Sequence, residues 1–257
     1  MAGRKPELAS IIGIIAGPGF LLIGNILEGG HTSSLIQITA AIIVFGGTLG
    51  CVMISAPLNV FIASLKGIID GFLAPHHDSA ALAEVIVDIA KRARKDGLVS
   101  LEGEVANLED EFLRDALMLA LDGMDSQAMR NQLETTIGRE EHEAEAIAKV
   151  FESAGAFCPT MGIIGAVMGL IHVMSNLSDV AKVGAGIAVA FVATIYGVGA
   201  ANIVFLPINK KIALQIHHHT QFREMAMEGA IAIQEGMNPR EVEALLRAYT
   251  GVAAEGK

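Results

Sequence analysis

The chain has 257 residues, of which 52% are hydrophobic, and its formal net charge is −10. A mean hydropathy of +0.51 argues against a soluble domain. The acidic charge excludes nucleic acid as a favoured partner, because phosphates repel an acidic surface. The two cysteines form no CxxC or Cys/His cluster, and the triplet His217, His218 and His219 is interpreted as a solvated run rather than a metal site. We therefore expect no metal and no bound cofactor.

Four long segments lack Asp, Glu, Lys and Arg: 8–27, 29–65, 153–178 and 183–209. A helix that crosses a bilayer needs about 20 mostly apolar residues. The segments therefore predict transmembrane helices near 9–27, 35–56, 155–175 and 184–206. Arg4 and Lys5 precede the first segment, and Glu28 and a second apolar segment follow it closely. This pattern favours an uncleaved signal anchor over a cleaved signal peptide.

Basic residues flank the predicted spans on one side. Lys66 follows the second span, and Lys210 and Lys211 follow the fourth, whereas the hairpin at 28–34 contains no Lys or Arg. Because Lys and Arg are enriched in cytoplasmic loops, both termini and the block between spans two and three are expected in the cytoplasm. The predicted fold is an all-α integral membrane protein, with four transmembrane helices in a 2+2 arrangement and a helical cytoplasmic block between spans two and three.

Four regions follow from this reading: transmembrane helices 1 and 2 (1–60), a cytoplasmic helical domain (61–152), transmembrane helices 3 and 4 (153–209) and a cytoplasmic C-terminal tail (210–257). The cytoplasmic domain contains 19 acidic and 9 basic residues. Apolar residues at helical spacing predict one helix over 79–93 (Leu82, Val85, Ile86, Ile89) and another over 109–121 (Phe112, Leu113, Ala116, Leu117). Asp96-Gly97 predicts a turn, and the charged stretch 132–150 predicts a largely solvated helix that enters span three.

Small residues recur four positions apart in every predicted span. The pairs are Gly13 and Gly17, Gly46 and Gly50, and Gly165 and Gly169, and span four offers Ala193, Gly197 and Ala201. Small residues let helix backbones approach closely in lipid, where the hydrophobic effect no longer drives helices together. We therefore expect tightly packed helices, either within a subunit or between subunits.

No predicted span contains Asp or Glu. Ion-coupled transport needs a group that binds and releases the ion inside the membrane, and this group is usually a carboxylate. The chain therefore either moves no ions or depends on a partner for the charge. The notable hydroxyl groups of spans three and four are Thr160, Thr194 and Tyr196, and Pro159 and Pro207 are candidate hinges at the cytoplasmic ends of the same two spans.

Four stretches in the same order resemble the MotA class of flagellar motor stator subunits, within the superfamily that includes the ExbB and TolQ energisers. They are ARKDGLVSLE at 93–102, PTMGIIGAVMGLIHVM at 159–174, FVATIYGVGAANIVFLPINKK at 191–211 and EGAIAIQEGMNPREVEALL at 228–246. The resemblance covers nearly the whole chain. It implies a homopentamer around a dimer of a MotB-type peptidoglycan-binding subunit, which supplies the ion-binding Asp, and a FliG-type rotor protein as second partner.

The resemblance also implies roles for individual residues. Arg94 and Glu102 match the rotor-contact positions, Pro159 and Pro207 match the coupling prolines, and Thr194 matches the hydroxyl that faces the ion path. Sodium-driven relatives carry a second threonine where this chain has Ala166. Thr160 lies six residues away, which is too far along a helix to replace it. We therefore expect H⁺ rather than Na⁺ as the transported ion.

Three other functions remain open on the sequence alone. An ExbB- or TolQ-like energiser of an outer-membrane system would be expected to have three spans and its main cytoplasmic block after the first. An intramembrane enzyme would need a nucleophile and base or metal ligands in the spans, which offer only His172, so we predict that the chain is not an enzyme. A passive structural membrane protein would not require the prolines and threonines at their positions.

Overall fold

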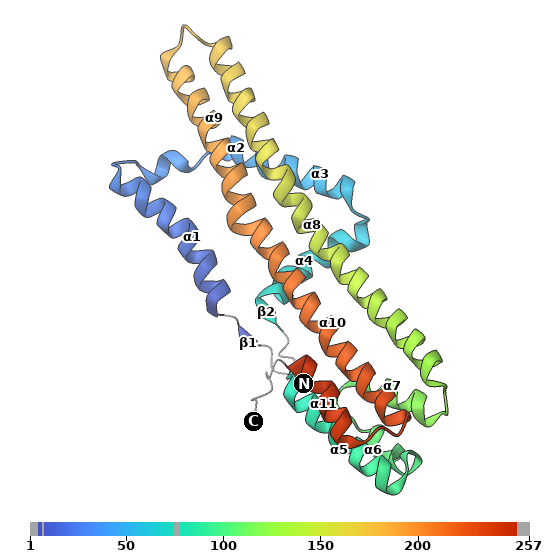
Figure 1. The fold of residues 1–257 in the computed structure, drawn as a ribbon. Helices are drawn as coiled ribbons and strands as arrows, with labels where there is room; N and C mark the ends of the chain where they lie inside the picture. The colour runs from blue at the N-terminus through green and yellow to red at the C-terminus, as the bar shows by residue number, and fades with distance from the viewer. Residues whose placement is uncertain (1–4, 7, 75–77, 251–257) are drawn as a thin grey trace. The chain divides into compact units, whose positions relative to one another are not determined.

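The computed structural model describes residues 5–6, 8–74 and 78–250 and divides into two compact units (Figure 1). The membrane unit comprises Lys5–Ala74 and Glu145–Leu214. The polar unit comprises, in its described part, 78–144 and 215–250. Two long helices, α8 (Ser126–Ser175) and α10 (Leu206–Gln234), contribute residues to both units.

The membrane unit contains four helices that are long and apolar enough to cross a bilayer, which confirms the predicted number of spans. The first is α1 (Leu8–Leu27). The second is built from three consecutive pieces: α2 (Ile38–Ala41), a π-helical turn (Ile42–Gly46) and α3 (Gly47–Ser55). A 3-10 turn, Thr32–Leu35, precedes these pieces at the start of the second apolar segment, Thr32–Ser55.

The third and fourth spans form a helical hairpin. The third is the C-terminal part of α8, and the fourth is α9 (Val180–Ala200), which continues through a π-helical turn (Ala201–Phe205) into α10. Figure 1 shows α8 and α9 side by side. Asp179 begins α9, since its carboxylate accepts hydrogen bonds from the backbone N–H groups of Ala181 and Lys182.

A shorter apolar helix, α4 (Leu58–Phe72), follows the second span after Ala56, whose backbone is extended. Directly after α4 in the chain, the two-residue strand β2 (Leu73–Ala74) pairs antiparallel with β1 (Lys5–Pro6). This short pairing holds the entrance to α1 beside the end of α4. The other regular elements in the described part of the membrane unit are helices.

The polar unit is also helical. It contains α5 (Ser79–Asp96), a 3-10 turn (Leu98–Leu101), α6 (Glu102–Val105), α7 (Glu111–Leu121), the N-terminal part of α8, the C-terminal part of α10 and α11 (Pro239–Thr250). Asp78 caps α5 through the Ala81 N–H (3.0 Å), and Asp110 caps α7 through the Leu113 N–H (2.7 Å). Gly97 ends α5 with φ +83°, which confirms the predicted turn.

One hydrophobic core joins the polar unit, and residues after the fourth span belong to it. Ile86, Leu113 and Met129 are buried in the same cluster as Met225 and Leu246. The two predicted helices of this block are confirmed as α5 and α7. One residue of the predicted apolar face was assigned wrongly: the side chain of Val85 is 40% exposed. The face of α5 that packs is instead completed by Val87 and Ala90, because α10 and α11 cover that side.

Arginines connect the helices of the polar unit. Arg130 on α8 makes a two-pronged ion pair with Glu228 on α10. Arg92 on α5 pairs with Asp88 and with Glu104 on α6. Planar guanidinium groups suit such forked contacts with carboxylates. These pairs fix the arrangement of α5, α6, α8 and α10 around the core.

Arg223 on α10 lies at the centre of a second polar cluster. Its guanidinium is 3.7 Å from the Asp110 carboxylate and 3.5 Å from that of Glu140, and it lies over the Phe112 ring. His219 Nε2 is 3.5 Å from the same Glu140 carboxylate. Burial and the nearby Arg223 charge lower the pKa of His219, so this imidazole is neutral at pH 7. The three histidines were predicted to be solvated. This is confirmed for His217 and His218, which are exposed, but not for His219, which is only partly exposed.

The close approach of α8 and α9 is made by glycines. A Cβ atom added at Gly162 would lie 2.9 Å from the Ala193 carbonyl oxygen, and one at Gly169 would lie 2.8 Å from that of Gly186. A Cβ at Gly197 would lie 2.7 Å from the carbonyl oxygen of Cys158. Side-chain carbons do not approach backbone atoms this closely. The predicted tight packing is thus confirmed for spans three and four, within one subunit.

The glycine pairs of spans one and two behave differently. Gly13, Gly46 and Gly50 have no atom within 4 Å of an added Cβ. A Cβ at Gly17 would lie 3.1 Å from Ile203 Cγ2, a side-chain contact and not a backbone one. Within the described chain, these pairs do not bring backbones together.

We predict that Gly169→Ala separates α8 from α9 and lowers stability by about 1–3 kcal/mol, as overpacking typically does. Thermal unfolding of the detergent-solubilised protein measures the effect. The matched control is Gly184→Ala on α9, the other helix of the hairpin, where an added Cβ meets nothing within 4 Å. Equal melting temperatures for the two variants would contradict the packing described above.

Candidate functional site

The threonine hydroxyls of spans three and four that were singled out by sequence donate to backbone carbonyls of their own helices. Thr160 Oγ1 donates to Phe157 O (2.6 Å), and Thr194 Oγ1 donates to Ala190 O (3.1 Å). A hydroxyl that donates its one proton keeps lone pairs that can accept or coordinate. Both threonines are exposed in the chain, so these oxygens are open to a ligand or partner.

The glycine contact brings the predicted ion-path positions of the two helices into one region. A Cβ at Gly162 would lie 3.5 Å from the Thr194 Cα and 3.2 Å from the Gly197 Cα. Gly162 stands between Thr160 and Ala166 on α8. The segment of α8 that carries those two residues therefore lies against the segment of α9 that carries Thr194. Ala166 is half-buried and adds no side-chain oxygen.

This region contains no anionic side chain. The apolar segments of all four spans lack Asp and Glu, and among the described residues no three His, Cys, Asp or Glu side chains are grouped to hold a metal ion. A cation or proton in transit would therefore find hydroxyl and backbone oxygens here, but no charge to bind it. The site is chemically incomplete in a single chain.

Tyr196 has a structural contact that the sequence did not reveal. Its hydroxyl donates to Leu35 O (2.6 Å) and accepts from the Gln37 N–H (3.2 Å). Its ring stacks on Phe45 at a centroid distance of 5.8 Å. Tyr196 therefore links α9 to the beginning of the second span. Its hydroxyl is occupied, which leaves the threonines as the hydroxyls available to an ion.

The two candidate hinge prolines have different surroundings. Pro159 lies inside α8, which is unbroken at that position, and follows the buried Cys158. Pro207 is the second residue of α10 and directly follows the π-helical turn Ala201–Phe205. A π turn widens the helix and suits the position before a proline, whose ring would otherwise meet the carbonyl four residues back. Pro207 was the sequence signal near this turn, but the sequence did not predict that the helix before the proline would take a π-helical form.

The predicted rotor-contact residues lie in the polar unit on both sides of the Gly97 turn. Arg94 is in the last turn of α5, and Glu102 is the first residue of α6; both are exposed. Neither forms an ion pair with another residue of the described chain. Their neighbours Arg92 and Glu104 pair with each other. The structure thus separates an internally paired set of charges from a set that faces solvent.

We predict that Tyr196→Phe lowers the melting temperature of the detergent-solubilised protein. The substitution leaves Leu35 O and Gln37 N–H without their partner, at a cost of about 1–3 kcal/mol. Thr194→Val is the matched control, because the Thr194 hydroxyl bonds only within its own helix and connects no second element. A Tyr196→Phe protein as stable as the Thr194→Val protein would show that the tyrosine hydroxyl does not hold the two spans together.

Comparisons with known proteins place this geometry in a family. Residues 11–97 match the motility protein A N-terminal model, and residues 104–225 match the MotA/TolQ/ExbB proton channel family. Motility protein A of Helicobacter pylori is 34% identical over 95% of each chain, and chemotaxis protein PomA of Vibrio alginolyticus is 32% identical over 98% of this chain and 97% of the relative.

A solved structure of C. jejuni MotAB is similar along the same length. It superposes with a TM-score of 0.90 at 29% identity and covers 97% of each chain. Sequence and structure agree over both the membrane and polar units, including the block between spans two and three. The chain therefore belongs to the MotA/TolQ/ExbB proton channel family, among its motility protein A members.

Proposed function

We propose that this chain is the stator subunit of a bacterial flagellar motor and converts proton flow into torque on the rotor. The observation that carries the proposal is a site with hydroxyls at Thr160 and Thr194 on the exposed face of a rigid helical hairpin, and with no charge of its own. Such a site requires a second chain to supply the carboxylate. The solved relative is a MotAB complex, which supports a MotB-type partner for this chain.

In the proposed assembly, five copies of the chain surround a dimer of the MotB-type peptidoglycan-binding subunit in the inner membrane. Both termini and the polar unit face the cytoplasm, as the distribution of Lys66, Lys210 and Lys211 indicates. The exposed faces of α8 and α9 contribute the wall against which the partner's Asp exchanges its ion. Pro159 and Pro207 lie at the ends of this wall and are the proposed points of coupling to the polar unit.

The proposed ion is the proton. A sodium ion must replace its water with several oxygen ligands. Ala166 offers no side-chain oxygen, so the side chains of this region supply only the Thr160 and Thr194 hydroxyl oxygens to such a shell. A proton needs only the partner's carboxylate and a path of water and hydroxyl groups, and the Thr194 hydroxyl suits such a path because it can accept as well as donate.

In a strain that lacks the gene for this chain, cells are expected to build flagella but not to swim. Restoring the natural gene should give swimming whose speed is the same in sodium and potassium media at constant pH and collapses with a protonophore. Thr194→Val should reduce the swimming speed. The control is Thr39→Val, which changes an exposed threonine on the second span and should leave the swimming speed unchanged. Sodium-dependent swimming that survives the protonophore would overturn proton coupling.

The proposed rotor contact is the exposed, unpaired charge at Arg94 and Glu102, acting on a FliG-type rotor protein. Exposed charges contribute less than about 1 kcal/mol to stability, so Arg94→Glu and Glu102→Lys should accumulate in the membrane at the natural level. Both should reduce torque in a tethered-cell assay, and opposite charge changes on the rotor protein should partly restore it.

The control for this charge reversal is Arg240→Glu, which changes an exposed arginine on α11. It should leave torque unchanged, because it lies on a different element from the Gly97 turn. Loss of the Arg94 and Glu102 variants from the membrane would instead assign these residues to folding.

A further inference from the structure

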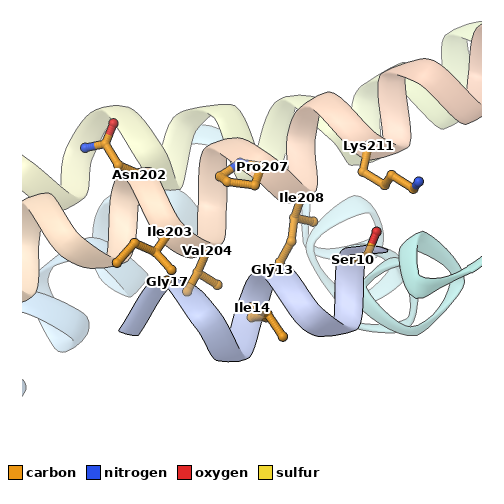
Figure 2. A pocket seen from close by; sticks show the side chains of 10 residues that line it. All are labelled: Ser10, Gly13, Ile14, Gly17, Asn202, Ile203, Val204, Pro207, Ile208 and Lys211. Carbon is orange, nitrogen blue, oxygen red and sulfur yellow. The ribbon is translucent and has the colours of Figure 1, made fainter. Parts of the chain in front are cut away.

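A cavity of about 370 Å³ lies between α1 and the fourth span at the π-helical turn (Figure 2). Its walls are mostly apolar, with Gly13, Ile14, Ile203 and Ile208 among the residues that line it, and Asn202 adds a polar side chain. Figure 2 shows Ser10 and Lys211 at one end of the cavity. All of these residues belong to the membrane unit.

The shape of the cavity follows from two glycines on α1. At Gly13, nothing lies within 4 Å of an added Cβ, so the helices stand apart there. At Gly17, one turn further along, Ile203 Cγ2 would lie 3.1 Å from an added Cβ, so the helices meet. The space therefore narrows from the Ser10 and Lys211 end toward Gly17. No described residue of α1 from Ala9 onward is buried by the rest of the chain.

The cavity is a narrow, mostly apolar space between two helices of the membrane unit. A hydrocarbon chain one methylene wide fits it, and hydrocarbon is the solvent that surrounds a membrane-spanning unit.

The positive charge of Lys211 at one end of the cavity indicates which class of lipid would bind there. Lys211 follows the last apolar segment of the fourth span, where the membrane meets water, and Lys210 stands beside it. A lysine at this depth extends its ammonium toward the headgroup region. We propose that the cavity is a binding site for an anionic phospholipid, with one acyl chain between α1 and the π-helical turn and the phosphate at Lys211. This completes the packing of α1, which the chain alone leaves open.

The test uses the full complex, purified with its partner subunit and reconstituted in mixed phosphatidylglycerol and phosphatidylcholine bilayers. A trace of either lipid carries a photoactivatable diazirine on its acyl chain, and mass spectrometry locates the labelled residues. We expect the phosphatidylglycerol probe to label Ile14, Ile203 and Ile208 several-fold more than the phosphatidylcholine probe does. Exposed Phe20 and Leu21 should show no preference between the two probes.

Two pairs of variants separate the acyl chain from the headgroup. Gly13→Leu fills the cavity and should reduce labelling several-fold, whereas Gly24→Leu adds the same side chain to α1 at another open position and should not. Lys211→Gln should abolish the preference for phosphatidylglycerol, and Lys210→Gln should retain it. Equal labelling by the two probes in the natural protein, or equal labelling in the two glycine variants, would overturn the proposal. These readouts do not depend on motility or on the identity of the transported ion.

Discussion

The structure depends on the backbone-to-backbone contact between α8 and α9. In lipid, helices gain nothing from leaving water, so their association rests on van der Waals contact and on the few polar groups that cross between them. Gly162, Gly169 and Gly197 remove the atoms that would keep the two helices apart. The same glycines leave no room for side chains between the helices. The hydroxyls of Thr160 and Thr194 are consequently displayed on the outside of the hairpin.

This arrangement explains how a span without charge can serve ion flow. A carboxylate inside the hairpin would have to be buried without a partner, which is costly in lipid. A hairpin of glycine and alanine is rigid and neutral, and it can present two hydroxyl oxygens at fixed positions. The charge that binds the ion can then reside on another chain, and binding and release can follow movement between the two chains instead of strain within one.

The length and order of the four spans could be predicted because a bilayer imposes a minimum number of apolar residues. The turn at Gly97 could be predicted because it depends on one residue and its immediate neighbours. The contacts of Tyr196 could not, since Leu35 and Gln37 lie about 160 positions away in the chain and no local pattern marks them. The exposure of Val85 was missed for the same reason: helical spacing identifies an apolar stripe, but its edge is set by the helices that cover it.

The candidate site shows a similar division. Thr160, Ala166 and Thr194 could be selected by motif, and the glycine contact then shows that their segments are adjacent. The two π-helical turns were not predicted: Pro207 marks a disturbance of the fourth span but not the form that it takes, and no proline lies in or directly after the turn of the second span. One of them, Ala201–Phe205, forms a wall of the cavity beside α1. The presence of this cavity therefore could not be predicted from the sequence either.

Ion pairing decides which charges of the polar unit can serve a partner. Arg92, Arg130 and Arg223 each face carboxylates of the same chain, so a partner's carboxylate would have to compete with a fixed, partly desolvated neighbour. An exposed guanidinium such as that of Arg94 carries no such competitor among the described residues. In a block with 19 acidic and 9 basic residues, the internal pairs occupy much of the positive charge. Arg94 at the end of α5 and Glu102 at the start of α6 therefore present unpaired charges of both signs on the two sides of the Gly97 turn. A partner with the complementary order of charges would be recognised by that order rather than by its net charge.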